Sequence, residues 1–402
     1  MMDNNIESYD VCIVGASIAG NYLCFLLSRM NLKIVVIEEH KEIGVPLQCA
    51  GIVSQKLSDL IDLPKELILN RVKIAKIIAP SGTHIKLSGA EKPYILNRIG
   101  LDKYFYNKTK DKKNITCYLG EKFKSFDYIK ANHKKILLIE TSKRNFKTKI
   151  LIGCDGPLST VGHLLGHKNK IIYAKQIRIK DQFNQNEAVL YFNPRWKELF
   201  GWIVPEGNNI YRIGLASSKN ITKKFELFAR EIKIDVNNRI DQQGGIIPYG
   251  SMNKISFDNI LLLGDAAGQV KATTGGGIIM LIICAKYAAS CIIKCFKANK
   301  YSKKFIQRNY EDPCKSSVGR HLKIHYMIRI LLEKFGDKDF ENLFKIVNTS
   351  NIEHLISIYG DMDFPKNLIL KLLKNPLVIM FLIKFSLKNP NIFIKLPKIF
   401  TK

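Results

Sequence analysis

Residues 9–20, Tyr-Asp-Val-Cys-Ile-Val-Gly-Ala-Ser-Ile-Ala-Gly, decide how the chain begins to fold. The first apolar run ends at Gly15, and a longer apolar stretch extends from Ile18 to Met30. The short run is typical of a buried strand, whereas the longer one predicts a helix. Residues 33–37, Lys-Ile-Val-Val-Ile, predict the next strand. Strand, turn, helix and strand make one βαβ unit, which implies a parallel sheet covered by helices.

The turn between Gly15 and Gly20 follows the dinucleotide-binding pattern G-x-G-x-x-G, with Ser17 in place of the second glycine. The glycines of this pattern allow a tight turn, close approach to a pyrophosphate and close helix–strand packing. The helix that follows presents free N–H groups to the phosphates, and the Ser17 hydroxyl can also donate. Glu38, 23 residues after Gly15, is suited to bind ribose hydroxyls, with Glu39 as the alternative.

Two other predicted strands end in an aspartate. Residues 149–152 lead into Gly153-Cys154-Asp155-Gly156, and residues 259–263 lead into Gly264-Asp265. Because ligands bind at the carboxyl edge of such sheets, Asp265 is suited to accept hydrogen bonds from a polyol chain. Glycines 275–277 open an apolar helix whose dipole favours a ligand with developing negative charge, such as a reduced flavin.

The remaining patterns predict two interleaved α/β domains and a helical end. Strand-like runs fill residues 71–96 and 171–255, and a helical pattern begins at about residue 301. We predict a nucleotide-binding domain from residues 1–70, 97–170 and 256–300. Residues 71–96 and 171–255 would form an antiparallel-sheet substrate domain, and residues 301–402 a helical C-terminal region.

Composition narrows the function classes. The chain has 402 residues, of which 46% are hydrophobic and 24% charged, as in globular proteins. Its net charge of +28 indicates either a basic binding surface or a general lysine bias, because lysine is spread over the whole chain. No nucleic-acid-binding pattern is present, so we expect no nucleic-acid partner.

Neither a metal site nor a membrane span is expected from the sequence. The nine cysteines include no C-x-x-C pair, so neither a zinc ribbon nor a redox dithiol is predicted. The polar, acidic start MMDNNIESYD is unlike a signal peptide. Lys286 interrupts the apolar run Ile278–Ile293, so we expect no membrane-spanning helix.

Taken together, these segments resemble the geranylgeranyl reductase family of flavoproteins, within the glutathione-reductase-like class that includes aromatic hydroxylases. The resemblance covers about residues 8–300. It rests on the fingerprint with Glu38, on Gly-Val-Pro-Leu-Gln-Cys-Ala-Gly at 44–51, on Asp155-Gly156, and on Gly264-Asp265 with residues 270–277. It implies a parallel-sheet FAD-binding domain interleaved with an antiparallel substrate domain. It also implies an FAD-dependent reductase that saturates C=C bonds in the isoprenoid chains of membrane lipids.

The resemblance also implies roles for individual residues. FAD contacts fall on Gly15, Ser17, Ala19, Gly20, Glu38, Cys49, Ala50, Arg98, Phe123, Asp155, Gly264, Asp265, Gly276, Gly277 and Ile278. Within this set, Phe123 would touch the adenine, and Cys49 and Ala50 would lie against the flavin. Residues 200–205, Phe-Gly-Trp-Ile-Val-Pro, match a family stretch that lines the substrate cavity and keep its Trp202 and Pro205.

The chemistry of alkene reduction needs a proton as well as a hydride. Cys49 is the candidate proton donor by family position, since a thiol can exchange protons near neutral pH. The alternative is that Cys49 is a small buried residue that packs against the flavin. Many flavin hydroxylases carry an NADPH-associated Arg where this chain has Gly162. The electron donor therefore remains open between NAD(P)H, a ferredoxin and a quinol.

The C-terminal segment 364–402 contains eight Lys and no acidic residue, and apolar runs alternate with the lysines. Such a segment can lie on an anionic lipid surface. The alternative is a helical cap over the substrate domain. We expect a cytoplasmic protein, peripheral at the inner membrane face. Two other functions stay open: an FAD monooxygenase or halogenase acting on a small aromatic, and a non-enzymatic flavin-binding protein at the membrane.

Overall fold

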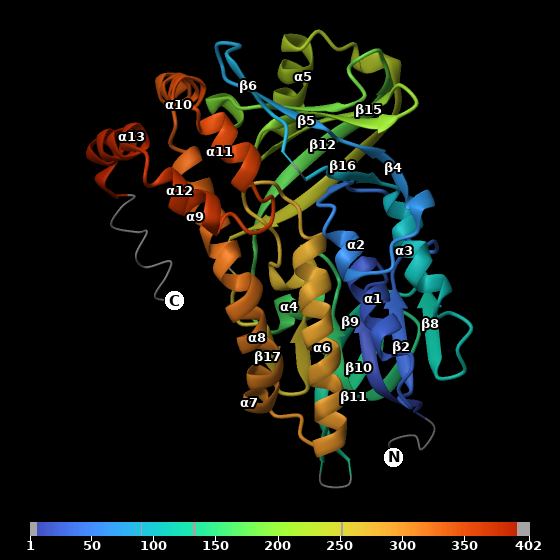
Figure 1. The fold of residues 1–402 in the computed structure, drawn as a ribbon. Helices are drawn as coiled ribbons and strands as arrows, with labels where there is room; N and C mark the ends of the chain where they lie inside the picture. The colour runs from blue at the N-terminus through green and yellow to red at the C-terminus, as the bar shows by residue number, and fades with distance from the viewer. Residues whose placement is uncertain (1–5, 90, 132–133, 251, 392–402) are drawn as a thin grey trace.

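The structure is a computed structural model that describes residues 6–89, 91–131, 134–250 and 252–391. Two sheets lie one above the other in Figure 1, and the C-terminal helices run along one side of both. The parallel and antiparallel sheets and the C-terminal helices confirm the predicted fold class.

The first sheet is built around β1 (Ser8–Val14), which pairs in parallel with β2 (Ile34–Glu38) and with β11 (Asn145–Gly153). β8 (Ile115–Leu119) and β18 (Ile260–Leu262) extend the parallel part on the two sides. These strands carry continuous apolar runs because helices cover both faces of a parallel sheet. β9 (Phe123–Ala131), β10 (Lys134–Thr141) and β17 (Ser256–Phe257) add antiparallel edges.

Helix α1 (Ile18–Leu27) follows the fingerprint turn and packs against α3 (Arg98–Asn107) and α6 (Ile278–Ala298). By length and composition α6 is apolar enough to cross a membrane, which differs from our expectation for this segment. However, 67% of its most apolar stretch is buried inside the protein, as in a core helix. Its buried face includes Cys284, Cys291 and Cys295, so these cysteines belong to the packing of the helix.

The second sheet has seven strands in the order β16-β12-β15-β14-β13-β5-β6. Their bounds are β5 Ile74–Ile78, β6 His84–Leu87, β12 Lys170–Lys180, β13 Glu187–Tyr191, β14 Gly201–Gly207, β15 Ile210–Ser217 and β16 Arg239–Tyr249. One pair, β13 with β5, is parallel, so the sheet is mixed where the sequence predicted it to be antiparallel. Helix α5 (Ile221–Glu231) covers one face through Phe225 and Phe228.

A small third sheet lies between the other two. It consists of β3 (Ile52–Val53), β7 (Tyr94–Leu96) and β4 (Ile68–Arg71). Short helix α2 (Leu57–Leu60) belongs to this part of the chain, whereas α4 (Thr160–Leu164) follows β11 and packs on β9 and β11 of the first sheet. This small sheet contributes to both cores, because Val53 and Leu96 pack in the core of the first sheet and Ile52 and Ile95 in that of the second.

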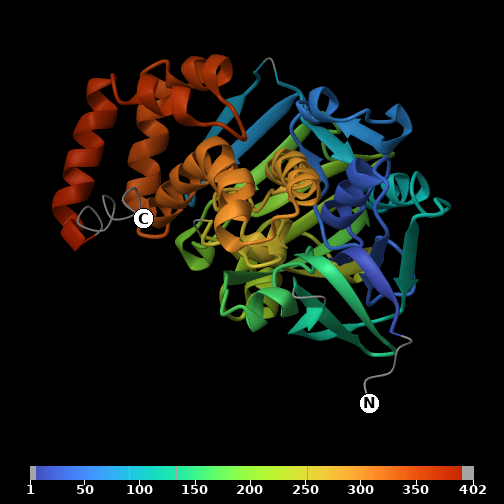
Figure 2. The ribbon, with the colours of Figure 1, turned by 90° about the horizontal axis from the view of Figure 1, so that it is seen from below.

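The C-terminal region begins with a helical rod of α7 (Lys303–Ile306), α8 (Asp312–Cys314) and α9 (Arg320–Leu332), joined by two π-helical turns. Helices α10 (Asp337–Thr349), α11 (Ile352–Tyr359), α12 (Lys366–Leu372) and α13 (Pro376–Lys388) follow. Phe335, Phe340, Phe381 and Phe385 form a core between them that also includes Ile85 of β6. Figure 2 shows α13 at the outer edge of the molecule.

Candidate active site

Three strand ends meet at one edge of the first sheet. The register pairs Val14 of β1 with Gly153 of β11, and Gly153 with Leu262 of β18. Gly15 has φ +97°, and a Cβ there would lie 2.4 Å from the carbonyl oxygen of Cys154. On the next strand, a Cβ at Gly264 would lie 3.0 Å from the Cβ of Ala19. The sequence segments predicted to hold one ligand are therefore neighbours in space.

Two predicted ADP-binding side chains also hold the fingerprint turn itself. The backbone N–H of Ala16 donates to Oε2 of Glu38 at 2.7 Å, and His40 donates its backbone N–H to Oε1. The Ser17 hydroxyl, expected to face a phosphate, donates to Oδ2 of Asp102 at 3.2 Å. Glu38 thus holds the turn in place from the end of β2. Glu39, the alternative ribose-binding residue, is exposed and forms an ion pair with Lys122.

At the same edge, Asp265, Arg98 and Gly277 have the chemistry that a flavin and its ribityl chain require. Burial raises the pKa of Asp265 to about 6, although the charge of Arg98 opposes that shift. No donor among the described residues hydrogen-bonds its carboxylate, and the buried Nε of Arg98 likewise has no partner there. A Cβ at Gly277 would lie 3.5 Å from Oδ1 of Asp265, so bare backbone borders the carboxylate. An acceptor, a donor and an open backbone therefore meet where the sequence predicts the cofactor.

The sulfur of Cys49 lies in this same group. It accepts hydrogen bonds from Nη1 of Arg98 at 3.2 Å and from the N–H of Gly51 at 3.3 Å. Nη2 of Arg98 reaches Oδ1 of Asp102 at 3.5 Å. Burial raises the pKa of Asp102, while Arg98 and the Ser17 hydroxyl act against that rise. The Arg98 guanidinium thus links Cys49, whose thiol is predicted to face the flavin, to Asp102. Asp102 in turn accepts from the Ser17 hydroxyl of the fingerprint turn.

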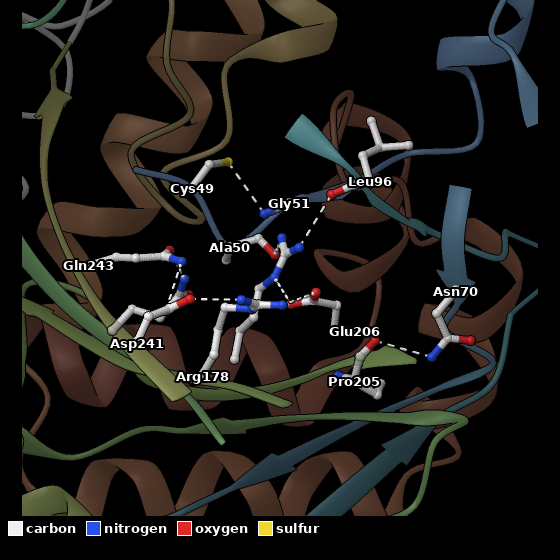
Figure 3. A network of polar contacts seen from close by, with 12 residues as sticks. Cys49, Ala50, Gly51, Asn70, Leu96, Arg178, Pro205, Glu206, Asp241 and Gln243 are labelled. Atoms are coloured by element: carbon white, nitrogen blue, oxygen red, sulfur yellow. Dashed lines mark hydrogen bonds and ion pairs between the residues drawn. The ribbon is translucent and has the colours of Figure 1, made fainter. Parts of the chain in front are cut away.

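A charged network beneath Cys49 connects its segment to the second sheet (Figure 3). Arg178 makes two hydrogen bonds to Glu206, at 2.8 and 2.7 Å, and a third to Asp241 at 2.7 Å. Glu206 also accepts from Nε of Arg212, whose Nη1 donates to the carbonyl oxygen of Ala50 at 2.9 Å. Burial acts to raise the pKa of Glu206, but the hydrogen bonds and charges of Arg178 and Arg212 act more strongly in the opposite direction, so the pKa lies below its ordinary value. The network thus ends on the backbone next to Cys49.

The same face of the second sheet carries Trp202, whereas Pro205, which pairs with Tyr211, lies out of phase with Trp202 on β14 and so on the other face. Trp202 is buried among Phe200, Val204 and Ile95, with the half-buried Ala50 packed against the group. Its indole N–H donates to Gln176 at 2.8 Å, and Gln176 and Gln243 continue the polar network toward Asp241. The carbonyl oxygen of Pro205 accepts from Asn70 at 3.1 Å. An apolar area therefore lies beside a charged one, close to the Cys49 segment.

Two predicted FAD contacts have structural roles here. Phe123 begins β9 and is buried in the core of the first sheet. Asp155 accepts from the hydroxyl of Ser159 at 2.5 Å and from the N–H of Val161 at 3.0 Å, which fixes the start of α4. Whether either also touches FAD stays a prediction.

Sequence reasoning did not identify Asp102, Arg178, Glu206 or Arg212 as part of the site. A weak signal for the last three was present, because residues 176–180 of β12 alternate between polar and apolar, and β14 and β15 each carry one charged residue, Glu206 and Arg212. Alternate residues of a strand point to opposite faces, so these charges share a face with Trp202.

Comparisons with known proteins agree with this geometry. The family described as FAD binding domain matches residues 8–280. An uncharacterized protein of Methanocaldococcus jannaschii, MJ1520, is 28% identical, covering 92% of this chain and 96% of its own. The digeranylgeranylglycerophospholipid reductase of Methanococcus vannielii is 26% identical over 83% of this chain and 89% of its own.

Solved structures show the same fold. A geranylgeranyl bacteriochlorophyll reductase-like protein from Thermoplasma acidophilum superposes with a TM-score of 0.78 at 23% identity, over 98% of this chain and 99% of that one. A halogenase, PltM, in complex with FAD gives a TM-score of 0.64 at 12% identity, over 88% of this chain and 84% of that one.

Proposed function

We propose that this chain, which belongs to the FAD binding domain family, saturates C=C bonds in the isoprenoid chains of membrane glycerophospholipids. It is an FAD-dependent oxidoreductase that resembles geranylgeranyl reductases, as the sequence predicted. Several relatives of similar length are named digeranylgeranylglycerophospholipid reductase, which supports this substrate class. The observation that carries the proposal is that the Arg98–Cys49 pair lies between the Asp265 edge and the apolar area around Trp202.

Each part of the site has a task in this reaction. Bound reduced FAD supplies the hydride, while the protein binds, orients and excludes water. Asp265 would accept a hydrogen bond from the ribityl chain of bound FAD, and Arg98 with Gly51 fixes the Cys49 sulfur. Hydride addition to one alkene carbon leaves the other short of a proton, which the Cys49 thiol donates. The thiol then recovers its proton from water, so the product gains two hydrogens per double bond.

The test is anaerobic incubation of the FAD-loaded protein with an unsaturated archaeal-type phospholipid and a chemical reductant. Mass spectrometry should find products that are heavier by two hydrogens for each double bond reduced. A lipid that stays unreduced with dithionite, with NAD(P)H and with reduced ferredoxin contradicts the proposal. A further arm with a quinol, compared with the NAD(P)H and ferredoxin arms, identifies the electron donor, which the sequence left open.

The rival function, oxygenation or halogenation of a small aromatic, has fold similarity as its support. A halogenase and monooxygenases are among the structural neighbours, at 12–15% identity, and at that level only the fold is shared. Phenols and indoles given to the reduced protein in air with chloride would distinguish the two functions. A hydroxylated or chlorinated product would favour the rival.

We also propose that the protein works as a peripheral protein at the cytoplasmic membrane face. Among the residues that the structure describes, nine of the sixteen exposed large apolar side chains lie within residues 358–387. We call the outer part of this surface the apolar–lysine face; it comprises Leu370, Leu373, Leu377, Met380, Ile383, Leu387 and the five lysines between residues 364 and 391. Exposed apolar side chains among lysines suit a surface of anionic lipids. Residues 392–402, the rest of the predicted basic segment, lie outside the described residues.

A further inference from the structure

The loop from Lys271 to Gly276 leads directly into Gly277 and Ile278, the predicted flavin contacts at the start of α6. Inside the loop, the N–H groups of Lys271 and Gly275 bond to the carbonyls of Gly276 and Lys271. Its outer side is held by side chains of the C-terminal region, which lies far away in the sequence. None of these holding side chains belongs to the candidate site.

Arg329 of α9 makes the most extensive of these contacts. Its side chain is 1% exposed, and its Nε donates to the carbonyl oxygen of Ala272 at 2.8 Å. Nη2 and Nη1 donate to the carbonyls of Thr273 and Lys197, both at 3.1 Å. No carboxylate in the described residues forms an ion pair with it within 4 Å. Burial lowers the pKa of Arg329 to about 10, so the guanidinium keeps its charge at neutral pH.

His325, one turn before Arg329 on α9, contacts the side chain of Thr273. Its Nε2 lies 3.1 Å from the carbonyl oxygen of Asp363, which can only accept, so Nε2 carries the hydrogen. Nδ1 therefore accepts from the Thr273 hydroxyl, at 2.6 Å. This assignment holds for the neutral imidazole, which burial favours because it lowers the pKa of His325 to about 4.

A buried ion pair completes the attachment. Nζ of Lys271 lies 2.5 Å from Oδ1 of Asp363 and donates to the carbonyl oxygen of Met362 at 3.1 Å. The two side chains are 6% and 0% exposed. Three consecutive loop residues, 271 to 273, are thus each held by a different side chain of residues 325–363.

We propose that Arg329, His325 and Asp363 are positioning residues for the flavin, acting through the loop Lys271–Gly276. Arg329 fixes the direction of two loop carbonyls, and its charge acts in the same sense as the positive N-terminus of α6. Both favour the negative charge that a reduced flavin acquires, and a buried charge acts strongly because little water screens it. The inference rests on the predicted flavin contacts at Gly276 and Gly277, and not on the identity of the substrate.

The test uses Arg329→Met, which keeps length and removes the charge and the donors. The matched control is Arg320→Met, an exposed arginine on the same helix. In the FAD-loaded protein, redox titration against a reference dye should give Arg329→Met a lower flavin potential. At a fixed solution potential the ratio of reduced to oxidised flavin should fall about tenfold, and Arg320→Met should match the unchanged protein.

A second readout needs neither FAD nor substrate. In the apoprotein, hydrogen–deuterium exchange of the amides at 271–277 should be faster in Arg329→Met and in Thr273→Val, and unchanged in Arg320→Met. If Arg329→Met does not fold, Arg329→Lys replaces it, with an intermediate change in exchange and potential expected. Equal potentials and equal exchange in the arginine variants at 329 and 320 would overturn the proposal. Failure to reduce a lipid would leave both readouts unaffected, so the two proposals can fail separately.

Discussion

Side chains at the edge of the first sheet differ in whether their hydrogen-bonding capacity is already used. Glu38 and Ser17 are engaged with the turn and with Asp102, whereas the carboxylate of Asp265 has no donor among the residues described. Asp265 is partly buried and its surroundings disfavour the ionised carboxylate, so a ligand hydroxyl that donates to it offsets that cost. The Asp265 carboxylate should therefore strengthen FAD binding without adding to the free energy of unfolding of the apoprotein.

We expect Asp265→Ala to weaken FAD binding by about tenfold to a hundredfold, the value of a hydrogen bond to a charged group. The apoprotein of this variant should be at least as stable at pH 8, because burial raises the pKa of Asp265 to about 6 and the ionised form is the unfavourable one. Flavin fluorescence titration and urea unfolding measure the two effects. Unchanged FAD affinity would exclude the ribityl role, and Asp265→Asn should lie between the two proteins.

Cys49→Ser should slow the transfer of hydrogen to the alkene by about a hundredfold while FAD binding changes little, since a positioned proton donor typically contributes at least that much. The rate is measured in a single turnover of pre-reduced protein with an unsaturated lipid. Cys117→Ser is the control, because Cys117 is also a partly exposed cysteine, and it lies on β8. Equal rates for the two variants would assign Cys49 to packing.

His325 should make the protein sensitive to acid. Burial lowers its pKa to about 4, the carbonyl of Asp363 opposes that shift, and the charges of Lys271 and His321 add to it. Below pH 6.5 His325 becomes protonated in the unfolded chain but stays neutral in the folded chain. The free energy of unfolding therefore falls as the pH drops toward 4. Between pH 7 and 4.5 this one residue should cost about 2 to 3 kcal/mol. Urea unfolding of His325→Gln should lack that loss, whereas His354→Gln, exposed on α11, should retain it.

At the scale of elements, the sequence predicted the strands and helices whose pattern is local. β1, α1, β2 and α6 lie within a few residues of their predicted bounds, because each carries a long apolar run between clear ends. β9 was not identified, since its Lys and Asp residues interrupt the apolar pattern. The parallel pairing of β13 with β5 joins segments about 110 residues apart, and no local pattern reports such a contact.

The segment from Cys49 to Val53 depends on glycine at one position. Gly51 has φ +77°, and a Cβ there would lie 2.1 Å from Nη1 of Arg212. Gly82 also has a positive φ, +90°, but nothing lies within 4 Å of its Cβ position. Gly82→Ala should therefore lose only about 1 kcal/mol of unfolding free energy from backbone strain, whereas Gly51→Ala should lose about 3 kcal/mol or more. Equal losses in urea unfolding would show that Arg212 does not hold this segment.

In the whole molecule, the C-terminal helices contact both sheets. α9 reaches the loop before α6 through Arg329, while α10 and α11 pack on β6 of the second sheet. The sequence predicted a helical region with basic and apolar residues, and left membrane binding and a cap over the substrate domain as alternatives. In the structure α13 buries Phe381 and Phe385 in the core that includes Ile85 of β6, as a helical cap does, and it exposes Ile383 and Leu387; membrane binding stays a prediction. Which residues face inward depends on contacts between distant segments, which no local pattern encodes.

Deletion of residues 364–402 would therefore remove core residues as well as the apolar–lysine face. The sharper change is a fourfold variant with Gln at Leu370, Met380, Ile383 and Leu387, which are 52%, 46%, 54% and 77% exposed. Cosedimentation with vesicles of anionic lipid should fall at least tenfold, because each apolar side chain buried in the interface contributes on the order of 1 kcal/mol. Binding of the unchanged protein should also weaken with salt and on neutral vesicles.

The matched control carries Gln at four exposed apolar residues elsewhere, Leu69, Leu158, Leu164 and Ile240. It removes a similar amount of apolar surface, so it should bind vesicles as the unchanged protein does. If both variants bind equally well, the apolar–lysine face is not the docking surface. If the control alone loses binding, the membrane contacts the other side of the molecule. A loss confined to the C-terminal variant would place the lipid bilayer against α12 and α13, the helices that follow the Asp363 contact with the flavin-side loop.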